Sequence, residues 1–243
     1  MRSELSTAGP TRVNRISIIM PVLDEADGLP ACLSRIAAQR GDRVELIVAD
    51  GGSADDTVGV ARKLSDHVVV APRGRASQMN AGAAVASGEV LLFLHADTRL
   101  PEGGLACILE AVDKGAVWGR FDVQIEGEAW MLRVVAALMN LRSRLSGIAT
   151  GDQAIFVRRE VFDAVSGYPD IALMEDVALC TALRRVARPA CLRQRVITSG
   201  RRWEKHGVLR TIFLMWRLRA AYWLGENPDE LALRYGYRPR ARR

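Results

Sequence analysis

Carboxylate side chains follow three apolar runs in the N-terminal half of this sequence. The runs and the acids after them are Ile16–Val22 with Glu25, Glu45–Ala49 with Asp50, and Val90–Leu94 with Asp97. Where such runs are parallel strands, their carboxyl ends meet at one edge of a sheet, and ligands bind beyond that edge. A carboxylate there can accept hydrogen bonds from a nucleoside or bind a hard divalent cation. The pattern therefore predicts a ligand site at this edge.

Asp50 and Asp97 each allow a plainer interpretation as well. Gly51 and Gly52 after Asp50 let a backbone approach a ligand closely, but Asp is also typical of turns. Asp97 ends the triplet His95-Ala96-Asp97, where one carboxylate suits Mg²⁺ or Mn²⁺ that takes its other ligands from substrate phosphates. A polar strand end would look the same.

Two arginine-rich segments could bind a diphosphate. Arg73 and Arg75 precede a predicted helix, and guanidinium groups beside free helical N–H groups suit phosphate oxygens. Arg201, Arg202 and Trp203 follow the last predicted strand and could balance a diphosphate leaving group. A solvated charge cluster is the plainer interpretation of both segments.

Glu175 and Asp176 form an adjacent pair of carboxylates at the start of a predicted helix. Neighbouring carboxylates repel each other, which raises the pKa of one of them and makes a useful general base. Acidic residues are also favoured in a first helical turn by the helix dipole.

The elements that must position these residues alternate between strand and helix. Strands are expected at Ile16–Val22, Glu45–Ala49, Val68–Ala71 and Val90–Leu94, and helices at Pro30–Gln39, from Ala54 with Ser53 as cap, and at Ala76–Ser87. This order predicts an α/β fold, with a mostly parallel central sheet flanked by helices. The second half predicts a half-exposed strand at Val117–Glu126, strands at Ala154–Val157 and Leu192–Thr198, and helices at Glu128–Leu145, Asp176–Val186 and Val208–Leu224.

Composition sets wider limits. With 243 residues, of which 49% are hydrophobic and 26% charged, the chain can bury one sizeable core and is neither disordered nor a disulfide scaffold. Its four cysteines include no C-x-x-C pair, which argues against a zinc site and favours a reducing compartment. The first 15 residues lack the apolar segment of a signal peptide, and no charge-free stretch is long enough for a membrane span. We expect a cytoplasmic protein.

Charge is concentrated at the C-terminal end. From residue 184 onward, Lys and Arg outnumber acids 16 to 4, which indicates an anionic partner. The predicted helices near residues 130–141 and 208–224 mix Trp, Met and Leu with arginine, as interfacial helices do. Peripheral contact with the cytoplasmic face of a membrane and a lipid-like acceptor are therefore hypotheses. Burial of these helices in the core or in a dimer interface is the alternative.

The order of these motifs resembles that of the nucleotide-sugar glycosyltransferases of family 2, which have the GT-A fold. The matching segments are residues 16–25, 46–57, 93–98, 151–153 and the pair 175–176. The run Arg-Gly-Arg-Ala-Ser-Gln-Met-Asn at 73–80, and His-Ala-Asp in place of Asp-x-Asp, resemble a small bacterial subgroup. The resemblance implies one domain at 15–235, with a nucleotide-binding half (15–100) and an acceptor half (101–235). Residues 1–14 would be flexible, and 236–243 a basic tail.

The resemblance also implies roles for single residues. Pro21, Glu25 and Asp50 would line the nucleoside pocket, Arg75 would lie near the base or the phosphates, and Asp97 would hold Mg²⁺ or Mn²⁺. Asp176 would be the general base of an inverting transfer, with Glu175 beside it. Gly151, Asp152 and Gln153 would mark the acceptor region, and Arg201, Arg202 and Trp203 the leaving group. The segment Ser199-Gly-Arg-Arg-Trp203 lacks the Gln of Gln-x-x-Arg-Trp found in processive members, which favours transfer of a single sugar.

The expected donor is a UDP- or GDP-sugar, and other functions stay open. A sugar-phosphate nucleotidyltransferase would use the same nucleotide and metal, and a catalytically silent, membrane-attached nucleotide-binding protein would keep the fold. A dehydrogenase is disfavoured because no G-x-G-x-x-G follows the first predicted strand. Nucleic-acid binding is disfavoured because no aromatic platform accompanies the basic end.

Overall fold

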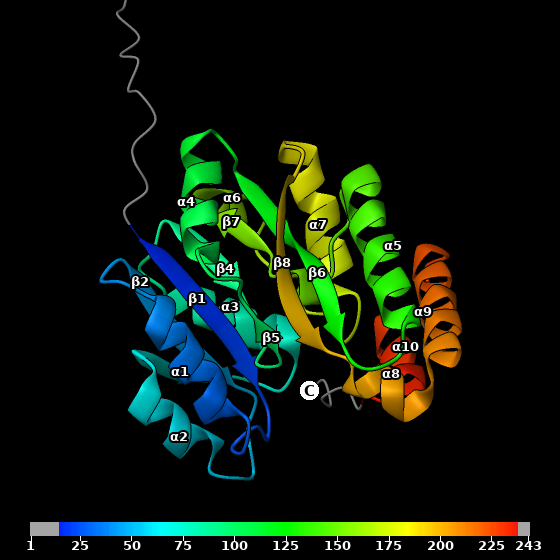
Figure 1. Ribbon diagram of the computed structural model, residues 1–243, viewed down its shortest axis with the longest axis horizontal. Helices are drawn as coiled ribbons and strands as arrows, with labels where there is room; N and C mark the ends of the chain where they lie inside the picture. The colour runs from blue at the N-terminus through cyan, green and yellow to red at the C-terminus, as the bar shows by residue number, and fades with distance from the viewer. Residues whose placement is uncertain (1–14, 238–243) are drawn as a thin grey trace, which may run out of the picture.

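One eight-stranded sheet runs through the computed structural model, which describes residues 15–237 (Figure 1). The strands are β1 (Ile16–Val22), β2 (Val44–Asp50), β3 (His67–Val70), β4 (Val90–Phe93), β5 (Thr98–Arg99), β6 (Trp118–Glu126), β7 (Phe156–Arg158) and β8 (Ala190–Ser199). Their order across the sheet is β3-β2-β1-β4-β7-β6-β8-β5.

The N-terminal half of the sheet is parallel. Strand β1 lies between β2 and β4, with Ile18 opposite Leu46 and Leu92. Successive side chains of a strand point to opposite faces, so Ile18 packs into the cluster on one face while Ile19 packs into the cluster on the other. Three of the four β-rich runs, β1, β2 and β4, are thus strands buried on both sides, whereas β3 lies at the edge of the sheet and is partly exposed.

Helices cover both faces, as expected of the α/β fold (Figure 1). They are α1 (Leu29–Gln39), α2 (Thr57–Leu64), α3 (Arg75–Val85), α4 (Gly104–Asp113), α5 (Met131–Ser146), α6 (Arg159–Ala164), α7 (Glu175–Val186), α8 (Arg201–His206), α9 (Val208–Trp223) and α10 (Pro228–Tyr235), with a 3-10 turn, η1, at Gly151–Gln153. Helices α1, α2 and α4 pack on one face, and α3, α6, α7, α9 and α10 pack on the other.

The C-terminal half of the sheet is mixed. Strand β7 is antiparallel to both β4 and β6, β8 is parallel to β6, and β5 is antiparallel to β8. The parallel character of the sheet is therefore strongest where the predicted nucleotide-binding half lies.

Two local predictions differ from the structure. The strand at Val117–Glu126 was expected to be half-exposed, and Gln124 and Glu126 are exposed as expected. Arg120 and Asp122 on the same polar face are buried, because they form an ion pair that Arg144 of α5 completes. Ser53 was expected to cap a helix from Ala54, but α2 begins only at residue 57. The Ser53 hydroxyl instead donates to the carboxylate of Asp50 and accepts the N–H of Asp24, in the loop after β1.

The described residues cover the whole of the predicted single domain at 15–235 and two residues beyond it. The predicted flexible segment 1–14 and most of the predicted basic tail, 238–243, lie outside the described residues. Within residues 15–237, no helix is both long and apolar enough to cross a bilayer.

Candidate active site

A cleft of about 250 Å³ opens beyond the carboxyl ends of β1 and β4. It is lined by Pro21, Val22, Leu23, Glu25, Arg75, Gln78, His95, Ala96, Asp97, Asp152 and Tyr237. Five of the predicted site residues are among them: Pro21, Glu25, Arg75, Asp97 and Asp152. The strand-end pattern in the sequence therefore does mark a cleft, at the edge where it was expected.

Backbone hydrogen bonds fasten together the loops after β1 and β2. The N–H of Asp24 donates to Ser53 Oγ (2.9 Å), and the N–H of Ala54 donates to Asp24 Oδ1 (2.7 Å). The N–H of Glu25 donates to Thr57 Oγ1 (2.8 Å). Because its backbone is held in this way, Glu25 presents its side chain to the cleft from a fixed loop.

Asp50 supports this wall from inside. It is 1% exposed, and its Oδ2 accepts the N–H groups of Gly52 (2.8 Å) and Ser53 (3.0 Å). Gln78 of α3 bridges the neighbouring strand ends, with Nε2 donating to Val22 O (2.7 Å) and Ala49 O (2.8 Å). Asp50 thus shapes the turn, as its plainer interpretation holds, and Gln78 was not singled out from the sequence.

The charges of Asp97 and Arg201 both act on Glu25. Burial raises the pKa of Glu25, the charge of Arg201 lowers it, and the charge of Asp97 raises it. Arg201 is the first residue of α8 and is not among the residues that line the cleft. The carboxylate of Asp97 is exposed to the cleft, and its one side-chain hydrogen bond within the described chain is a long contact with Thr98 Oγ1 (3.4 Å).

His95 and Asp152 join the end of β4 to η1. His95 Nδ1 lies 3.7 Å from Asp152 Oδ1. Burial opposes the charge of Asp152, but His95, Arg75 and Arg142 together hold the pKa of this carboxyl below its usual range. Gly151 must be small here, since a Cβ atom would come within 2.4 Å of the His95 ring.

The carboxylate pair Glu175 and Asp176 begins α7 next to η1. Asp176 Oδ2 accepts the N–H of Gly151 (3.0 Å), and Oδ1 accepts the N–H of Val177 (2.7 Å). Burial and the charge of Asp176 raise the pKa of Glu175 to about 7, and burial also raises the pKa of Asp176. The half-buried Asp176 is thus the oriented member of the pair, and the buried Glu175 holds its proton up to near-neutral pH.

Arg75 lies between the cleft and this pair. Burial opposes its charge, while Glu175, Asp152 and Asp176 hold the pKa of Arg75 above its usual value. It is the first residue of α3 and lines the cleft with Asp97. The Arg75 guanidinium therefore lines the cleft and also interacts electrostatically with Glu175 and Asp176.

Three predicted site residues are engaged in packing. Arg202 stacks on the Tyr235 ring at 3.6 Å and donates Nη2 to Tyr235 O (2.6 Å). Trp203 packs beside Leu132 of α5. Gln153 is fully buried and donates to Ser143 Oγ (3.1 Å), which ties η1 to α5. None of the three lines the cleft.

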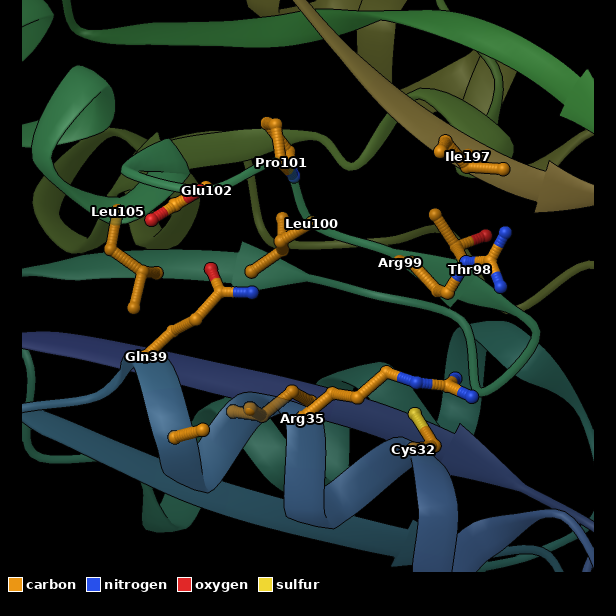
Figure 2. Close-up of a pocket in the computed structure, with 12 residues that line it drawn as sticks. Cys32, Arg35, Gln39, Thr98, Arg99, Leu100, Pro101, Glu102, Leu105 and Ile197 are labelled. Atoms are coloured by element: carbon orange, nitrogen blue, oxygen red, sulfur yellow. The ribbon is translucent and has the colours of Figure 1, made fainter.

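A second cavity, of about 420 Å³, lies between α1 and the segment from β5 to α4 (Figure 2). Figure 2 shows Gln39 and Glu102 at one end of it and Cys32 and Thr98 at the other. Burial raises the pKa of the Cys32 thiol to about 11, so this sulfur is not a ready nucleophile. No predicted site residue lines this cavity.

The donor set of the cleft fits a divalent cation that arrives with phosphate. No cluster of three or more His, Cys, Asp or Glu side chains that could hold a metal occurs within residues 15–237. The exposed Asp97 carboxylate offers hard oxygen ligands, and Mg²⁺ commonly takes one or two carboxylates and completes its shell with phosphate oxygens and water. Asp97 would therefore hold the metal against a diphosphate.

Arg142 of α5 is a further charged residue near this site that the sequence analysis missed. Asp176 and Asp152 both act on its charge. Position 142 lies seven residues after the buried Val135 on an amphipathic helix. That spacing, an arginine in line with the buried stripe, was the signal available in the sequence.

The comparisons with known proteins show the family of this chain. A sequence model described as Glycosyl transferase family 2 matches residues 17–165, more than half of the chain. The chain belongs to glycosyltransferase family 2. Among its relatives, a PGL/p-HBAD biosynthesis glycosyltransferase of Mycobacterium tuberculosis (strain ATCC 25177 / H37Ra) is 33% identical over 164 residues, which cover 63% of this chain and 62% of that protein. An uncharacterised glycosyltransferase of Mycobacterium tuberculosis (strain ATCC 25618 / H37Rv) is 32% identical over 167 residues, covering 63% of this chain and 75% of that protein.

Solved structures place the fold. TarS 1–349 of S. aureus superposes with a TM-score of 0.62 at 18% identity, over 76% of this chain and 60% of that one. Glucosyl-3-phosphoglycerate synthase from Mycobacterium tuberculosis, crystallised with Mn²⁺, UDP and glucosyl-3-phosphoglycerate, superposes with a TM-score of 0.58 at 19% identity, over 76% and 71%. At these identities the likeness shows the fold, which is GT-A.

Proposed function

We propose that this chain transfers one sugar from a nucleotide-diphospho-sugar to an acceptor hydroxyl or carboxylate. The observation that carries the proposal is the position of the oriented Asp176 carboxylate behind a cleft lined by Arg75 and Asp97. Such an arrangement supports donor binding on one side and proton removal on the other. Crystals of structural neighbours with UDP or UDP-GlcNAc favour a UDP-sugar over a GDP-sugar as donor.

The mechanism that we propose is a single inverting displacement. With a hydroxyl acceptor, Asp176 accepts its proton as the acceptor oxygen attacks the anomeric carbon, a step worth about 10²–10⁴-fold in rate. A carboxylate acceptor attacks without loss of a proton. The bond to the nucleoside diphosphate breaks, and its electron pair stays on the departing phosphate. Arg75 and Arg201 balance the charge that develops there. When bound, Mg²⁺ or Mn²⁺ at Asp97 neutralises charge on the diphosphate.

We further propose a lipid-like acceptor and work at the cytoplasmic surface of a membrane. Apolar side chains three, four or seven residues apart form an exposed stripe along each of α5 and α9. They are Val134, Leu138, Leu141 and Leu145 on α5, and Leu209, Phe213, Trp216 and Trp223 on α9. The inner faces of the two helices pack together through Leu132 and Ile212, and the exposed Arg133, Arg210 and Arg217 accompany the stripes. Exposed apolar side chains with arginine beside them complement an anionic bilayer surface.

Calorimetric titration with UDP, GDP, dTDP and ATP, each with and without Mn²⁺, tests the donor site. We expect micromolar, metal-dependent binding of one diphosphate, lost in Asp97→Ala and kept in the control Asp113→Asn on the exposed side of α4. Binding that needs no metal and survives Asp97→Ala would overturn the assignment of Asp97.

Product analysis separates the competing functions. A transferase releases a nucleoside diphosphate from the sugar nucleotide, whereas a sugar-phosphate nucleotidyltransferase consumes a nucleoside triphosphate and releases pyrophosphate. A catalytically silent protein binds the diphosphate and cleaves neither compound. Release of UDP from a UDP-sugar, slow with water and faster with a cell lipid extract, would support both the transferase and the lipid-like acceptor.

A further inference from the structure

Two guanidinium nitrogens of Arg142 are buried without a hydrogen-bond partner in the described part of the chain. Its Nε and Nη2 atoms are shielded from solvent and make no hydrogen bond with residues 15–237. Burial lowers the pKa of Arg142, and the charge of Asp176 opposes that shift. Buried charges are normally paired, because an unpaired one loses its hydration without compensation. Arg142 is therefore a donor that lacks its acceptor.

The carboxylates that act on Arg142 indicate which ligand would supply the missing hydrogen-bond acceptor. Asp176 and Asp152 act on Arg142 from α7 and η1, and the same two carboxylates act on Arg75. Arg75 approaches them from α3, on the side of the nucleotide cleft, whereas Arg142 approaches from α5, in the acceptor half. Both arginines thus interact electrostatically with Asp152 and Asp176, and of the two only Arg75 lines the nucleotide cleft.

Helix α9 adds another buried guanidinium nitrogen without a hydrogen bond. The Nε atom of Arg219 is also buried, with no hydrogen-bond partner within residues 15–237. Tyr222, one helical turn further on, has its pKa raised by burial and by the charge of Asp176. This face of α9 therefore looks toward the general base that we propose. Trp216 and Trp223 of the exposed apolar stripe lie one helical turn before and after Arg219, so the stripe borders this face.

We propose that Arg142, assisted by Arg219, binds an anionic group, a carboxylate or a phosphate, that the acceptor carries near the atom receiving the sugar. The inference rests on the proposed function and names the class of its acceptor. The planar fork of an arginine matches two oxygens of such a group, and charge-assisted hydrogen bonds of this kind are strong and directional. Binding the anion would place the acceptor oxygen beside Asp176.

Anion binding to the UDP complex tests this directly. The protein is first saturated with UDP and Mg²⁺, so that the nucleotide cleft is filled, and then titrated with inorganic phosphate and with acetate. We expect Arg142→Gln to weaken binding of the preferred anion by about ten-fold or more, as expected for a lost hydrogen bond to a charged group. Arg142→Lys, which keeps the charge but loses the fork, should bind with intermediate affinity, and Arg219→Gln should weaken binding less.

Arg133→Gln is the matched control, since Arg133 lies on the same helix and is exposed to solvent. A third titration uses dodecyl phosphate in neutral detergent micelles. Tighter binding of dodecyl phosphate than of free phosphate would indicate a lipid-borne anion, and the reverse a water-soluble acceptor; both outcomes support the site if Arg142→Gln weakens them.

Equal anion affinity in the wild type and Arg142→Gln, or no anion binding by the wild type, would overturn the inference. UDP affinity and the unfolding midpoint of each variant are measured alongside; if Arg142→Gln is unfolded, Arg142→Lys and Arg219→Gln decide. Should UDP itself fail to bind, the proposed function fails. The phosphate titration without UDP would still decide whether Arg142 binds an anion.

Discussion

The two halves of the sheet differ in how their charged groups are satisfied. In the half that we propose binds the nucleotide, residues 15–100, Asp50 accepts two backbone N–H groups, and the buried Glu45 accepts hydrogen bonds from both Ser87 and Gly88. In the proposed acceptor half, residues 101–235, buried N–H groups of Arg142 and Arg219 have no partner among the described residues. A half whose polar groups are already paired is preformed, whereas unpaired groups mark where a ligand has still to bind.

Exposed apolar surface divides the molecule in the same way. Of the fourteen large hydrophobic side chains that are exposed in residues 15–237, only Val70 and Val85 come before residue 101. The rest belong to the acceptor half, and most of them lie on or next to α5 and α9. The contrast indicates that residues 15–100 leave little apolar surface for a partner to cover, whereas residues 101–235 present an apolar surface that a partner would cover.

Asp176→Asn should separate catalysis from nucleotide binding most clearly. Without the carboxylate, the acceptor proton has no base, and turnover should fall by about 10²–10⁴-fold while UDP affinity stays the same. Steady-state rates with a UDP-sugar and calorimetry with UDP measure the two effects. Asp163→Asn, on the exposed side of α6, is the control. Loss of UDP binding in Asp176→Asn would mean that the halves do not divide the work as proposed.

Glu175→Gln should stabilise the protein at alkaline pH. Burial and the charge of Asp176 raise the pKa of Glu175 from 4.5 to about 7, so between these pH values the folded state holds a proton that the unfolded state has released. Stability from this group is complete below pH 4.5 and is lost as the pH rises through about 7. At pH 8 the neutral Gln should therefore add on the order of 3 kcal/mol to the free energy of unfolding.

Urea unfolding of the wild type and Glu175→Gln at pH 5 and pH 8 measures this difference. The two proteins should differ much less at pH 5, where Glu175 keeps its proton in the folded state. An equal difference at both pH values would show that the effect comes from packing and not from ionisation.

The strands of the nucleotide half could be predicted from the sequence because their signals are local. Runs such as Ile16–Val22 are β-rich, and turn residues end them. Ser53 was misassigned as a helix cap because its partners, among them the N–H of Asp24, come from a loop far away in the sequence. Alternating charges on β6 suggested exposure, and only the ion pair of Arg120 with Asp122 explains their burial.

The residues that line the cleft could be predicted from the sequence in part. Strand-end carboxylates such as Glu25 and Asp97 do line one cleft, because parallel strands bring their ends together. The opposite outcome for Arg201 and Arg202 could not be predicted, since adjacent residues at a helix start point in different directions and only tertiary contacts tell them apart. Arg142 was missed because an isolated arginine on an apolar helix looks like a snorkelling side chain.

Acidic substitutions on α9 test whether its exposed apolar surface contacts a membrane. The double variant Phe213→Glu with Trp216→Glu replaces two exposed apolar side chains, 62% and 66% accessible, that we propose enter the bilayer. We expect co-sedimentation with vesicles containing phosphatidylglycerol to weaken by about ten-fold or more, since burying one such side chain is worth about 1.5–3 kcal/mol. Val70→Glu, on β3 and also 66% exposed, should bind vesicles as the wild type does.

Wild-type protein that stays in the supernatant at low salt would contradict the membrane proposal. Binding that Val70→Glu reduces as much as the double variant would show a general charge effect, and not one of α9.

Arg201 and Arg202 are adjacent, but Arg201 acts on Glu25 whereas Arg202 packs against Tyr235. Variants of the two residues therefore separate a role in the site from a role in packing. Arg202→Gln loses the stacking on Tyr235 and the hydrogen bond to its carbonyl, so the free energy of unfolding should fall by about 1–2 kcal/mol with little change in the turnover of the folded enzyme. Arg201→Gln removes the charge that faces Glu25 and should lower turnover with little change in stability. Thermal unfolding and steady-state kinetics on both variants separate the two roles. If both variants lose turnover equally and keep their stability, Arg202 serves the leaving group as the sequence suggested, and its contact with Tyr235 is not what holds α8 against α10.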